Sequence, residues 1–528
     1  MEKHSRAWLA AVLLVAAAAL SWKACRTGGP FLSDDSYQYL GAARHLLQHG
    51  SLATWVAHFD EQVDTRRLPV PLTHFAAGYP LAIAALGLLG VSLPVAGMLL
   101  SALGYVVCGW LLWKAGRELN LGNWLAASLA VIWLLNSGSL AFSVSVGTDS
   151  LFAALTVAMG LTMQIDIKGG GRRPMLLLGI GATAGAAYLV RYAGLFLLPT
   201  AGLYLAWRGW RDRDCRRWSA GGVVLAGALF GAGALRNVAL TGSWRGFRSP
   251  GHTDVKAIAI ETGKAFYHIV FGGGVVARLD FWLLLFAAGA AAAAVLCWRS
   301  FRRGTASALA APIAARQLAW IGILSFVYGA GIVGAALNTL ASDFPRYYFP
   351  LYPFALLAAG VMLRAAGAKR APLLAALCLV PVIVVQARTL SLPPMEQSSV
   401  AMRKMMDQEV SPGLSVRAWI ALHASATEPL FAADGQAVQY VLDRPVVSIL
   451  DPERSARSWD ETCFRSLMTG FHSRLIVLFP RASDSESPEQ QGPFLREVLR
   501  GRLPPWLRTA TQSTDVLVLE CGACAGEK

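Results

Sequence analysis

Two adjacent carboxylates, Asp34 and Asp35, open a short amphipathic stretch, FLSDDSYQYLGAARHLLQHG, at residues 31–50. A positioned carboxylate can take the proton from an attacking hydroxyl, so the pair could supply a general base. There is also a simpler explanation, because acidic side chains at a helix start are stabilised by the unpaired amide groups and the helix dipole. The pair by itself leaves both interpretations open.

The stretch that carries the pair has the features of one complete helix. Ser33 is a suitable N-cap and Gly50 a suitable C-terminal stop. Apolar and aromatic side chains recur at helical spacing on one face: Tyr37, Leu40, Ala43 and Leu47. We therefore predict a helix that lies on the outer membrane surface and does not cross the bilayer.

The chain around this helix is strongly apolar. Of its 528 residues, 55% are hydrophobic and only 15% are charged, whereas about a quarter of residues are charged in soluble proteins. Several runs approach the ~20 apolar residues that cross a bilayer. The formal charge of +15 does not indicate a nucleic-acid partner, because the basic residues lie between apolar runs. The composition predicts a polytopic α-helical membrane protein.

The distribution of basic loops predicts the topology. We expect about eleven spans, at 7–22, 93–115, 122–142, 148–164, 175–190, 193–207, 219–235, 279–298, 318–338, 349–366 and 371–387. With a cytoplasmic N-terminus, every inside loop is rich in Lys and Arg, as short retained loops are. The first span resembles a signal peptide, but WKAC lacks the cleavage spacing, which favours an uncleaved anchor.

This topology divides the chain into two predicted domains. Residues 1–390 form the membrane domain, with long outer loops at 23–92 and 236–278, and residues 391–528 lie outside the membrane. The tail alternates short apolar strands with amphipathic helices, which indicates a small α/β domain. Cys521 and Cys524 could form a disulfide, and a disulfide that involves Cys463 is an alternative; a zinc site there lacks a second ligand pair.

Further ionisable residues fall on the predicted outer side. Arg66 and Arg67 precede HFAAGYPLAIAALGLLG, whose apolar run after Pro80 is too short to cross and indicates a re-entrant or interfacial helix. Asp149 and Arg346 lie at the outer ends of predicted spans, and Arg236 opens the second long loop. Ionisable groups at such depths are costly unless they face protein, water or a ligand. Together they place carboxylates opposite arginines on one side of the membrane.

In this order, the motifs resemble those of GT-C glycosyltransferases. DDSYQYL is similar to their D(D/E)-x-x-Y motif, TDSLFAAL to the acidic motif of the second outer loop, and HFAAGYPLAIAAL, ALRNVALTG and RYYFPLYPF to three further motifs. The resemblance covers roughly residues 7–390. The nearest subgroup contains bacterial lipopolysaccharide-core sugar transferases, lipid A aminoarabinose transferases and protein O-mannosyltransferases.

The resemblance implies a GT-C-like fold and transfer of a sugar from a polyprenyl-phosphate donor. Asp34 matches the catalytic base, and Asp35 stands where the family often has the longer Glu. Asp149 matches the second-loop acid, and Arg346 lies where the donor phosphate is expected. The other residues assigned to donor-phosphate or substrate binding are Arg66, Arg67, His74, Arg236, Tyr37 and Tyr347. The acceptor would be a hydroxyl on a glycolipid, a glycan or a protein, at the outer face of a bacterial inner membrane.

The residue types suit this chemistry. A lipid-phosphate leaving group departs as an anion of low basicity, so it needs fixed positive charge and no general acid. Arginine stays charged and binds phosphate bidentately. One carboxylate plus an arginine clamp is therefore sufficient, whereas a glycosidase needs two carboxylates that flank the bond. A single displacement of this kind predicts inversion at the anomeric carbon.

Three alternatives stay open at this stage. A divalent cation could bind if Asp34, Asp35, Asp149 and His74 converge, although arginine can neutralise the phosphate without a metal. His45 and His49 share a helix face and could bind zinc, but a polar surface face is the simpler explanation. A transporter or flippase for a lipid or small solute is the competing function, although the chain shows no repeated halves with interrupted spans.

Overall fold

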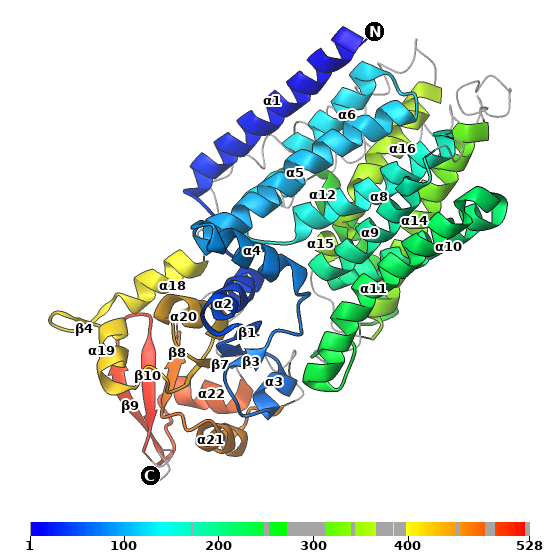
Figure 1. Cartoon of the computed structure of the whole chain (residues 1–528). Helices are drawn as coiled ribbons and strands as arrows, with labels where there is room; N and C mark the ends of the chain where they lie inside the picture. The colour runs from blue at the N-terminus through cyan, green and yellow to red at the C-terminus, as the bar shows by residue number, and fades with distance from the viewer. Residues whose placement is uncertain are drawn as a thin grey trace.

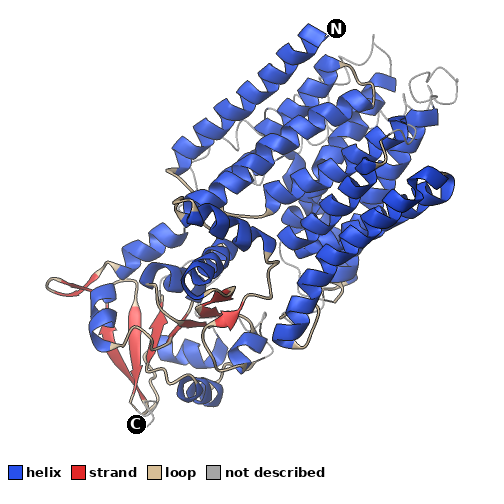
Figure 2. Cartoon of the chain, in the orientation of Figure 1, coloured by secondary structure: helices blue, strands red, loops and turns tan. Residues whose placement is uncertain are grey.

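The computed structural model describes residues 2–169, 173–247, 253–271, 312–338, 344–365, 384, 398–449, 455, 457–480 and 492–522. These residues form a bundle of long helices with a mixed β-sheet at one end (Figures 1 and 2). The N-terminus of the first helix lies at the end of the bundle away from the sheet.

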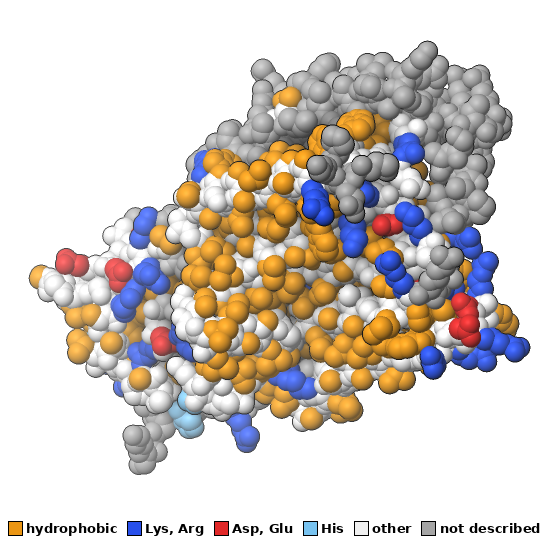
Figure 3. All heavy atoms as spheres, turned by 45° about the horizontal axis from the view of Figure 1, so that its top comes forward, with side chains coloured by type: hydrophobic (Ala, Val, Ile, Leu, Met, Phe, Trp, Pro, Cys, Tyr) orange, Lys and Arg blue, Asp and Glu red, His pale blue; other side chains and the backbone are white. Residues whose placement is uncertain are grey.

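Five described helices are long and apolar enough to cross a membrane, or up to six if a pair bent by 60° counts as one span. The five are α1 (Glu2–Thr27), α5 (Leu93–Glu118), α8 (Asp149–Gly169), α11 (Arg216–Thr241) and α14 (Pro312–Ala336). The bent pair is α6 (Asn123–Leu135) and α7 (Ser137–Val144). Large apolar side chains such as Leu14, Leu103 and Phe326 are exposed on these helices, and apolar atoms cover much of the face in Figure 3.

The remaining predicted spans are shorter helices or fall outside the description. The shorter helices are α9 (Met175–Val190), α10 (Leu198–Arg211), which follows the 3-10 turn η1 (Tyr192–Leu197), and α16 (Tyr352–Ala365), which follows α15 (Phe344–Tyr348) and η3 (Phe349–Leu351). The spans expected at 279–298 and 371–387 lie outside the described residues, Val384 excepted. A total of about eleven spans therefore stays a prediction.

The second outer loop begins later than expected. Helix α11 continues through Arg236 and ends at Gly242, whose φ of 73° is the left-handed conformation that commonly ends a helix. Helix α12 (Val255–Phe271) then occupies much of the loop expected at 236–278. Arg236 is therefore a helical residue.

The first outer loop forms a compact layer at the end of the bundle. It contains α2 (Asp34–His49), β1 (Ala53–Thr54), β2 (Val56–Ala57), α3 (Asp60–Asp64), β3 (Val70–Pro71) and α4 (Gly78–Leu88). Ser33 caps α2 in a capping box with Ser36, and Gly50 ends it at φ 73°, as expected. Helix α4 has 11 residues, too few to cross a bilayer, which agrees with the interfacial helix that we predict there.

The tail contributes five strands of a six-stranded sheet with the order β2-β7-β6-β8-β10-β9. These strands are β6 (Leu430–Ala432), β7 (Val446–Ser448), β8 (Leu475–Leu478), β9 (Leu507–Gln512) and β10 (Leu517–Cys521). Strands β2, β7, β6 and β8 run parallel, and β10 pairs antiparallel with β8 and β9. The tail also contains α18 (Ser398–Met406), β4 (Glu409–Ser411), β5 (Leu414–Ser415), α19 (Val416–His423), α20 (Gly435–Leu442), α21 (Glu461–Gly470) and α22 (Gly492–Leu499).

The sheet joins the first outer loop to the tail, because its edge strand β2 comes from residues 56–57. Ion pairs reinforce the connection: Arg457 contacts Asp60 at 3.2 Å and also contacts Asp64. The first loop and the tail therefore lie at the same end of the bundle, as an odd number of spans requires. The α/β layer is therefore built from the first outer loop as well as from the tail.

The two disulfide predictions for the tail have different results. Cys521 is disulfide-bonded, which agrees with the disulfide expected at this end of the chain. Cys463 is a free thiol, so the alternative disulfide that involves Cys463 is wrong. Cys463 precedes Phe464, which packs inside the apolar layer under the sheet.

The end of α8 away from the sheet carries a buried ion pair. Arg208 Nε of α10 donates to Asp166 Oδ2 at 2.5 Å, and the Tyr204 hydroxyl donates to the same oxygen at 2.7 Å. The Asp166 side chain is fully buried and that of Arg208 is 7% exposed. The pair holds α8 against α10.

The turn from α9 into η1 depends on a glycine. A Cβ atom on Gly194 would lie 2.3 Å from the backbone nitrogen of Tyr188, so only a residue without a side chain lets η1 fold back on α9. By contrast, a Cβ atom on Gly202, in α10, would meet nothing within 4 Å. The two glycines form a matched pair for substitution.

We expect Gly194→Ala to lower the free energy of unfolding by about 1–3 kcal/mol, the usual cost of overpacking. Gly202→Ala should leave stability unchanged or raise it by up to about 1 kcal/mol, because alanine favours helix. Thermal unfolding of the detergent-solubilised protein measures both. Equal melting temperatures for the two variants would contradict the close approach at Gly194.

Candidate functional site

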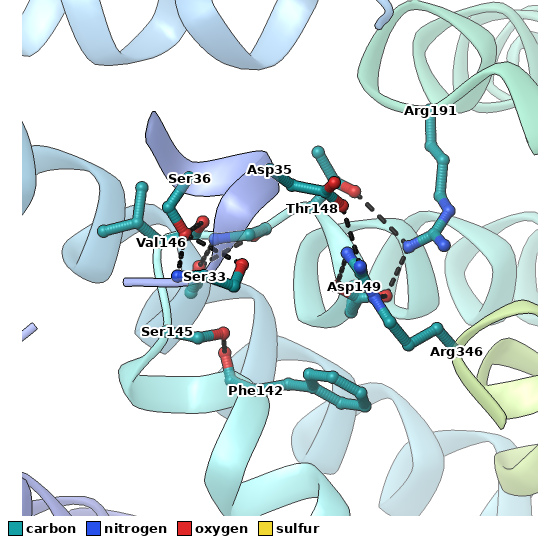
Figure 4. Close-up of polar contacts among 12 residues, drawn as sticks. Ser33, Asp35, Ser36, Phe142, Ser145, Val146, Thr148, Asp149, Arg191 and Arg346 are labelled. Atoms are coloured by element: carbon teal, nitrogen blue, oxygen red, sulfur yellow. Dashed lines mark hydrogen bonds and ion pairs between the residues drawn. The ribbon is translucent and has the colours of Figure 1, made fainter. Parts of the chain in front are cut away.

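A buried carboxylate lies between two arginines at the end of the bundle that faces the sheet (Figure 4). Asp149 is the first residue of α8, and its side chain is only 2% exposed. Arg191 Nη1 contacts Asp149 Oδ1, while Arg346 Nη2 lies 3.0 Å from Oδ2 and Arg346 Nε lies 3.3 Å from Oδ1. Both carboxylate oxygens therefore accept bonds from guanidinium groups.

Arg346 extends this network to the first outer loop. Its Nη1 donates to Asp35 Oδ2 at 2.7 Å. The Arg346 side chain is 21% exposed and that of Asp35 is 28% exposed, so this part of the network can be reached from outside. The structure thus brings Asp35, Asp149 and Arg346 together from three segments that are far apart in the sequence.

Backbone pairing fixes the spacing between the two acidic segments. Phe31 N donates to Val144 O and Val146 N donates to Phe31 O, each at 2.9 Å. The Ser36 hydroxyl then donates to Val146 O at 2.7 Å. The N-terminus of α2 and the loop before α8 are therefore joined directly, which holds Asp35 close to Asp149.

The loop before α8 is supported from beneath by α5 and α4. The Ser101 hydroxyl donates to Gly147 O at 2.8 Å, and the Tyr79 hydroxyl lies 3.1 Å from Ser101 Oγ and 2.9 Å from Gly97 O. Tyr79 and Ser101 are fully buried. These bonds support the backbone of the loop that leads into Asp149.

Arg191 is the site residue that the sequence analysis missed. It stands between α9 and η1 in an extended conformation, with φ −150° and ψ 132°, and its guanidinium carbon lies 5.2 Å from the centre of the Tyr347 ring. The sequence did contain a signal for Arg191: it is a single arginine between two apolar runs, at the outer end of a helix, and a charge there needs a partner. Tyr347, assigned to substrate binding, therefore does lie beside the network.

The two members of the acidic pair have different surroundings. Asp34 is exposed at the first position of α2, whereas Asp35 is partly buried against Arg346. Tyr39, one turn further along α2, is buried behind the pair. Burial, reinforced by the Asp35 carboxylate, raises the pKa of the Tyr39 phenol well above its ordinary value, so this hydroxyl stays protonated.

Four residues assigned to the substrate site have structural partners elsewhere. Arg66 Nη2 donates to Ser466 Oγ of α21 at 3.3 Å, and Arg67 is exposed beside it. His74 stacks on Phe59 with ring centres 3.6 Å apart. Arg236 donates to the backbone oxygens of Leu72 at 2.8 Å and Leu52 at 3.3 Å, which ties α11 to the first loop.

Tyr37 also lies apart from the network. It is buried, and its ring centre lies 5.0 Å from that of Tyr440 in α20. Tyr37 therefore packs between the first loop and the tail. The role in substrate binding that the family resemblance implies for Tyr37 stays a prediction.

The described residues contain no group of three or more His, Cys, Asp or Glu side chains that could hold a metal ion. The convergence of Asp34, Asp35, Asp149 and His74 is therefore not found. His74 Nδ1 instead lies 3.1 Å from Phe247 O. His45 and His49 pack together with ring centres 4.6 Å apart, and His45 Nδ1 lies 2.9 Å from Ser51 O.

The arrangement is suited to bind an anion. Two guanidinium groups meet at one point, and two carboxylates hold them in place. Arginine groups fixed in this way can stabilise charge that develops on a phosphate without having to reorganise. While no anion is bound, the two carboxylates balance the positive charge of the two arginines.

Comparisons with known proteins bear on the fold of the chain. Residues 78–232 match a family model described as dolichyl-phosphate-mannose-protein mannosyltransferase. No curated protein sequence matches the chain. The resemblance to GT-C glycosyltransferases is confirmed by this match together with the structural similarities that follow.

Among solved structures, ArnT from Cupriavidus metallidurans in the apo state aligns over 99% of this chain and 100% of its own, with 14% identity and a TM-score of 0.58. The same protein bound to undecaprenyl phosphate aligns over 99% of both chains, with 13% identity and a TM-score of 0.54. The archaeal oligosaccharyltransferase AglB from Archaeoglobus fulgidus, in complex with an inhibitory peptide and a dolichol-phosphate, covers 89% of this chain and 69% of its own, with 14% identity and a TM-score of 0.50. At such identities the similarity establishes the fold, which is that of the GT-C glycosyltransferases.

The network predicts strong coupling between Asp149 and Arg191. We expect Asp149→Asn and Arg191→Gln together to destabilise the protein by less than the sum of the two single changes, with a coupling energy of about 0.5–3 kcal/mol. The reason is that each single change leaves one buried charge without this partner. Denaturation of the four proteins in detergent gives the coupling energy.

The control for this cycle pairs Asp149→Asn with Arg236→Gln. Arg236 bonds to backbone oxygens of the first loop, so its loss should add to that of Asp149 within about 0.5 kcal/mol. Additivity in the Arg191 cycle as well would show that the contact contributes nothing to stability.

Proposed function

We propose that this protein is an inverting glycosyltransferase. It moves a sugar from a polyprenyl-phosphate donor to an acceptor hydroxyl on a glycolipid, a glycan or a protein. The reaction takes place at the outer face of a bacterial inner membrane, with the N-terminus in the cytoplasm. The observation that carries the proposal is the meeting of Asp35, Asp149, Arg191 and Arg346 at one end of a GT-C-like bundle.

The donor phosphate binds at the guanidinium groups of Arg346 and Arg191. Arg346 is partly exposed and reaches both acidic segments, so it can exchange a carboxylate for a phosphate oxygen. Support for a lipid phosphate comes from the similar fold of a protein bound to undecaprenyl phosphate. Tyr347 covers the Arg191 guanidinium and limits the directions from which an anion can approach it.

The acceptor hydroxyl oxygen attacks the anomeric carbon from the face opposite the phosphate. A new carbon–oxygen bond forms, and the bond between the anomeric carbon and the phosphate oxygen breaks. Its electron pair leaves with the phosphate, whose charge the arginines stabilise. The hydroxyl proton passes to a carboxylate. Because the attack comes from the face opposite the phosphate, the configuration at the anomeric carbon is inverted.

Within the acidic pair we assign the base to Asp34 and the positioning of Arg346 to Asp35. A general base must present an accessible oxygen to the hydroxyl, and Asp34 is the exposed member. Asp35 has one oxygen engaged by Arg346 at 2.7 Å. Aspartate in place of the family's longer Glu fits this short contact.

The membrane orientation has independent support. The disulfide at Cys521 fits an oxidising compartment such as the periplasm. The first loop and the tail share one sheet, so the candidate site and the disulfide lie at the same end of the bundle. Both observations favour a site that opens to the outside.

We expect Asp34→Asn to abolish sugar transfer, with a loss of about 10²–10⁴-fold for a general base, while the affinity for undecaprenyl phosphate stays unchanged. Arg346→Gln should lose both transfer and affinity for that lipid phosphate. Mass spectrometry of lipids and envelope glycans from a deletion strain that carries each variant measures transfer, and ligand-dependent melting of the purified protein measures affinity.

Arg508→Gln is the matched control, because Arg508 is an exposed residue of β9 that pairs with Glu520; it should restore the glycan and keep the affinity. A folded Asp34→Asn protein that restores the glycan fully would refute the base assignment. An unchanged set of lipids and glycans in the deletion strain, with solute or lipid flux in proteoliposomes, would replace the enzyme proposal with a transporter.

A further inference from the structure

Helix α2, which carries the acidic pair, is held between two other helices on different faces. Toward α4, Tyr39 contacts Phe75 and Tyr79 with ring centres 4.9 and 5.2 Å apart. Toward α20 of the tail, α2 presents Tyr37, Gly41 and Arg44, which recur at helical spacing and so share a face. The membrane domain and the tail therefore both determine where α2 lies.

The α20 contacts extend over two turns of α2. The Tyr37 and Tyr440 rings lie 5.0 Å apart at an angle of 33°. A Cβ atom on Gly41 would lie 3.8 Å from Gln439 Oε1, so the helices approach closely at this point. Arg44 forms an ion pair with Asp443 at the end of α20. Three successive positions of α2 thus meet three positions of one short helix.

Helix α20 is itself fixed to the sheet. A Cβ atom on Gly435, its first residue, would lie 2.8 Å from the Ser448 Cα of β7, so α20 lies directly against that strand. Strand β7 pairs on one side with β2 of the first loop and on the other with β6. The close contact with β7 fixes the first turn of α20 against the sheet.

We propose that α20 positions the acidic end of α2, and that Tyr440 is a positioning residue for Asp34 and Asp35. The inference rests on the proposed glycosyl transfer for its kinetic consequence. Tyr37 follows Asp34 by one turn, so a change in the tilt of α2 at Tyr37 moves both carboxylates. Both donor arginines are also held by Asp149 of the helix bundle, so a tilt of α2 should weaken phosphate binding less than it weakens transfer.

The test compares Tyr440→Ala with Tyr440→Phe, which keeps the ring, and with Phe494→Ala as the control. Phe494 is a half-buried ring in α22 that contacts Phe464 and Trp506, away from α2. Tyr440→Ala should lower restoration of the glycan about tenfold, since small displacements at a reacting centre have large effects on rate. Its affinity for undecaprenyl phosphate should fall by a smaller factor than transfer does, because Arg191 and Arg346 keep Asp149 as a partner. Tyr440→Phe should behave like the unchanged protein.

Hydrogen exchange gives a readout that does not depend on activity. In the full-length detergent-solubilised protein, Tyr440→Ala should speed exchange of the amides of residues 34–40 about tenfold, whereas Phe494→Ala should not. Equal exchange in these residues for the two alanine variants would overturn the positioning role. If no glycan depends on the protein, the proposed function fails, but the exchange result still decides the inference.

Gly41 provides a second variant in case Tyr440→Ala does not fold. Gly41→Ala places a methyl group at an ordinary contact distance from Gln439 and should leave transfer unchanged. Gly41→Leu should push α2 from α20 and reproduce the loss of transfer, with a smaller loss of lipid-phosphate affinity. Full transfer by a folded Gly41→Leu protein would also overturn the proposal.

Discussion

The arrangement of this molecule depends on one buried carboxylate. Asp149 has almost no access to water, and such a charge is tolerated only with close partners and hydrogen bonds. It obtains them from Arg191, between two helices, and from Arg346, more than 150 residues further along the chain. Satisfying this charge forces α8, the α9–η1 turn and α15 to converge at one point.

The convergence of these helix ends also explains why the first outer loop is attached so closely to the helix bundle. Arg346 has donors left after it binds Asp149, and one of them reaches Asp35. The pairing of Phe31 with Val144 and Val146 brings α2 within range. The site is therefore built from helix ends and short backbone pairings, and these leave it open on the side of the exposed Asp34.

Much of this was accessible from the sequence because the signals were local. The caps of α2 are set by Ser33 and Gly50, and the short α4 by the length of its apolar run. The grouping of Asp35, Asp149 and Arg346 followed from their common side of the membrane. Arg191 was missed because it was treated as a break between helices, although a charge at that depth needs a partner.

Long-range contacts were not predictable in the same way. Strand β2 has two residues, and nothing in the letters Val56–Ala57 indicates that they join a sheet built almost 400 residues later. The contact of Tyr37 with Tyr440 was equally hidden, because a helix turns about 100° per residue and sequence neighbours face different partners.

The buried pair at the far end of α8 has a consequence for movement. Asp149 pairs with Arg191 and Asp166 pairs with Arg208, so the same number of residues separates the two acids and the two arginines. The two ion pairs join α8 to the segment that ends in α10 at two points, about 25 Å apart along the helix axis. If α8 slid along its axis relative to that segment, both ion pairs would break together. This side of the bundle is therefore braced against sliding at both ends of α8.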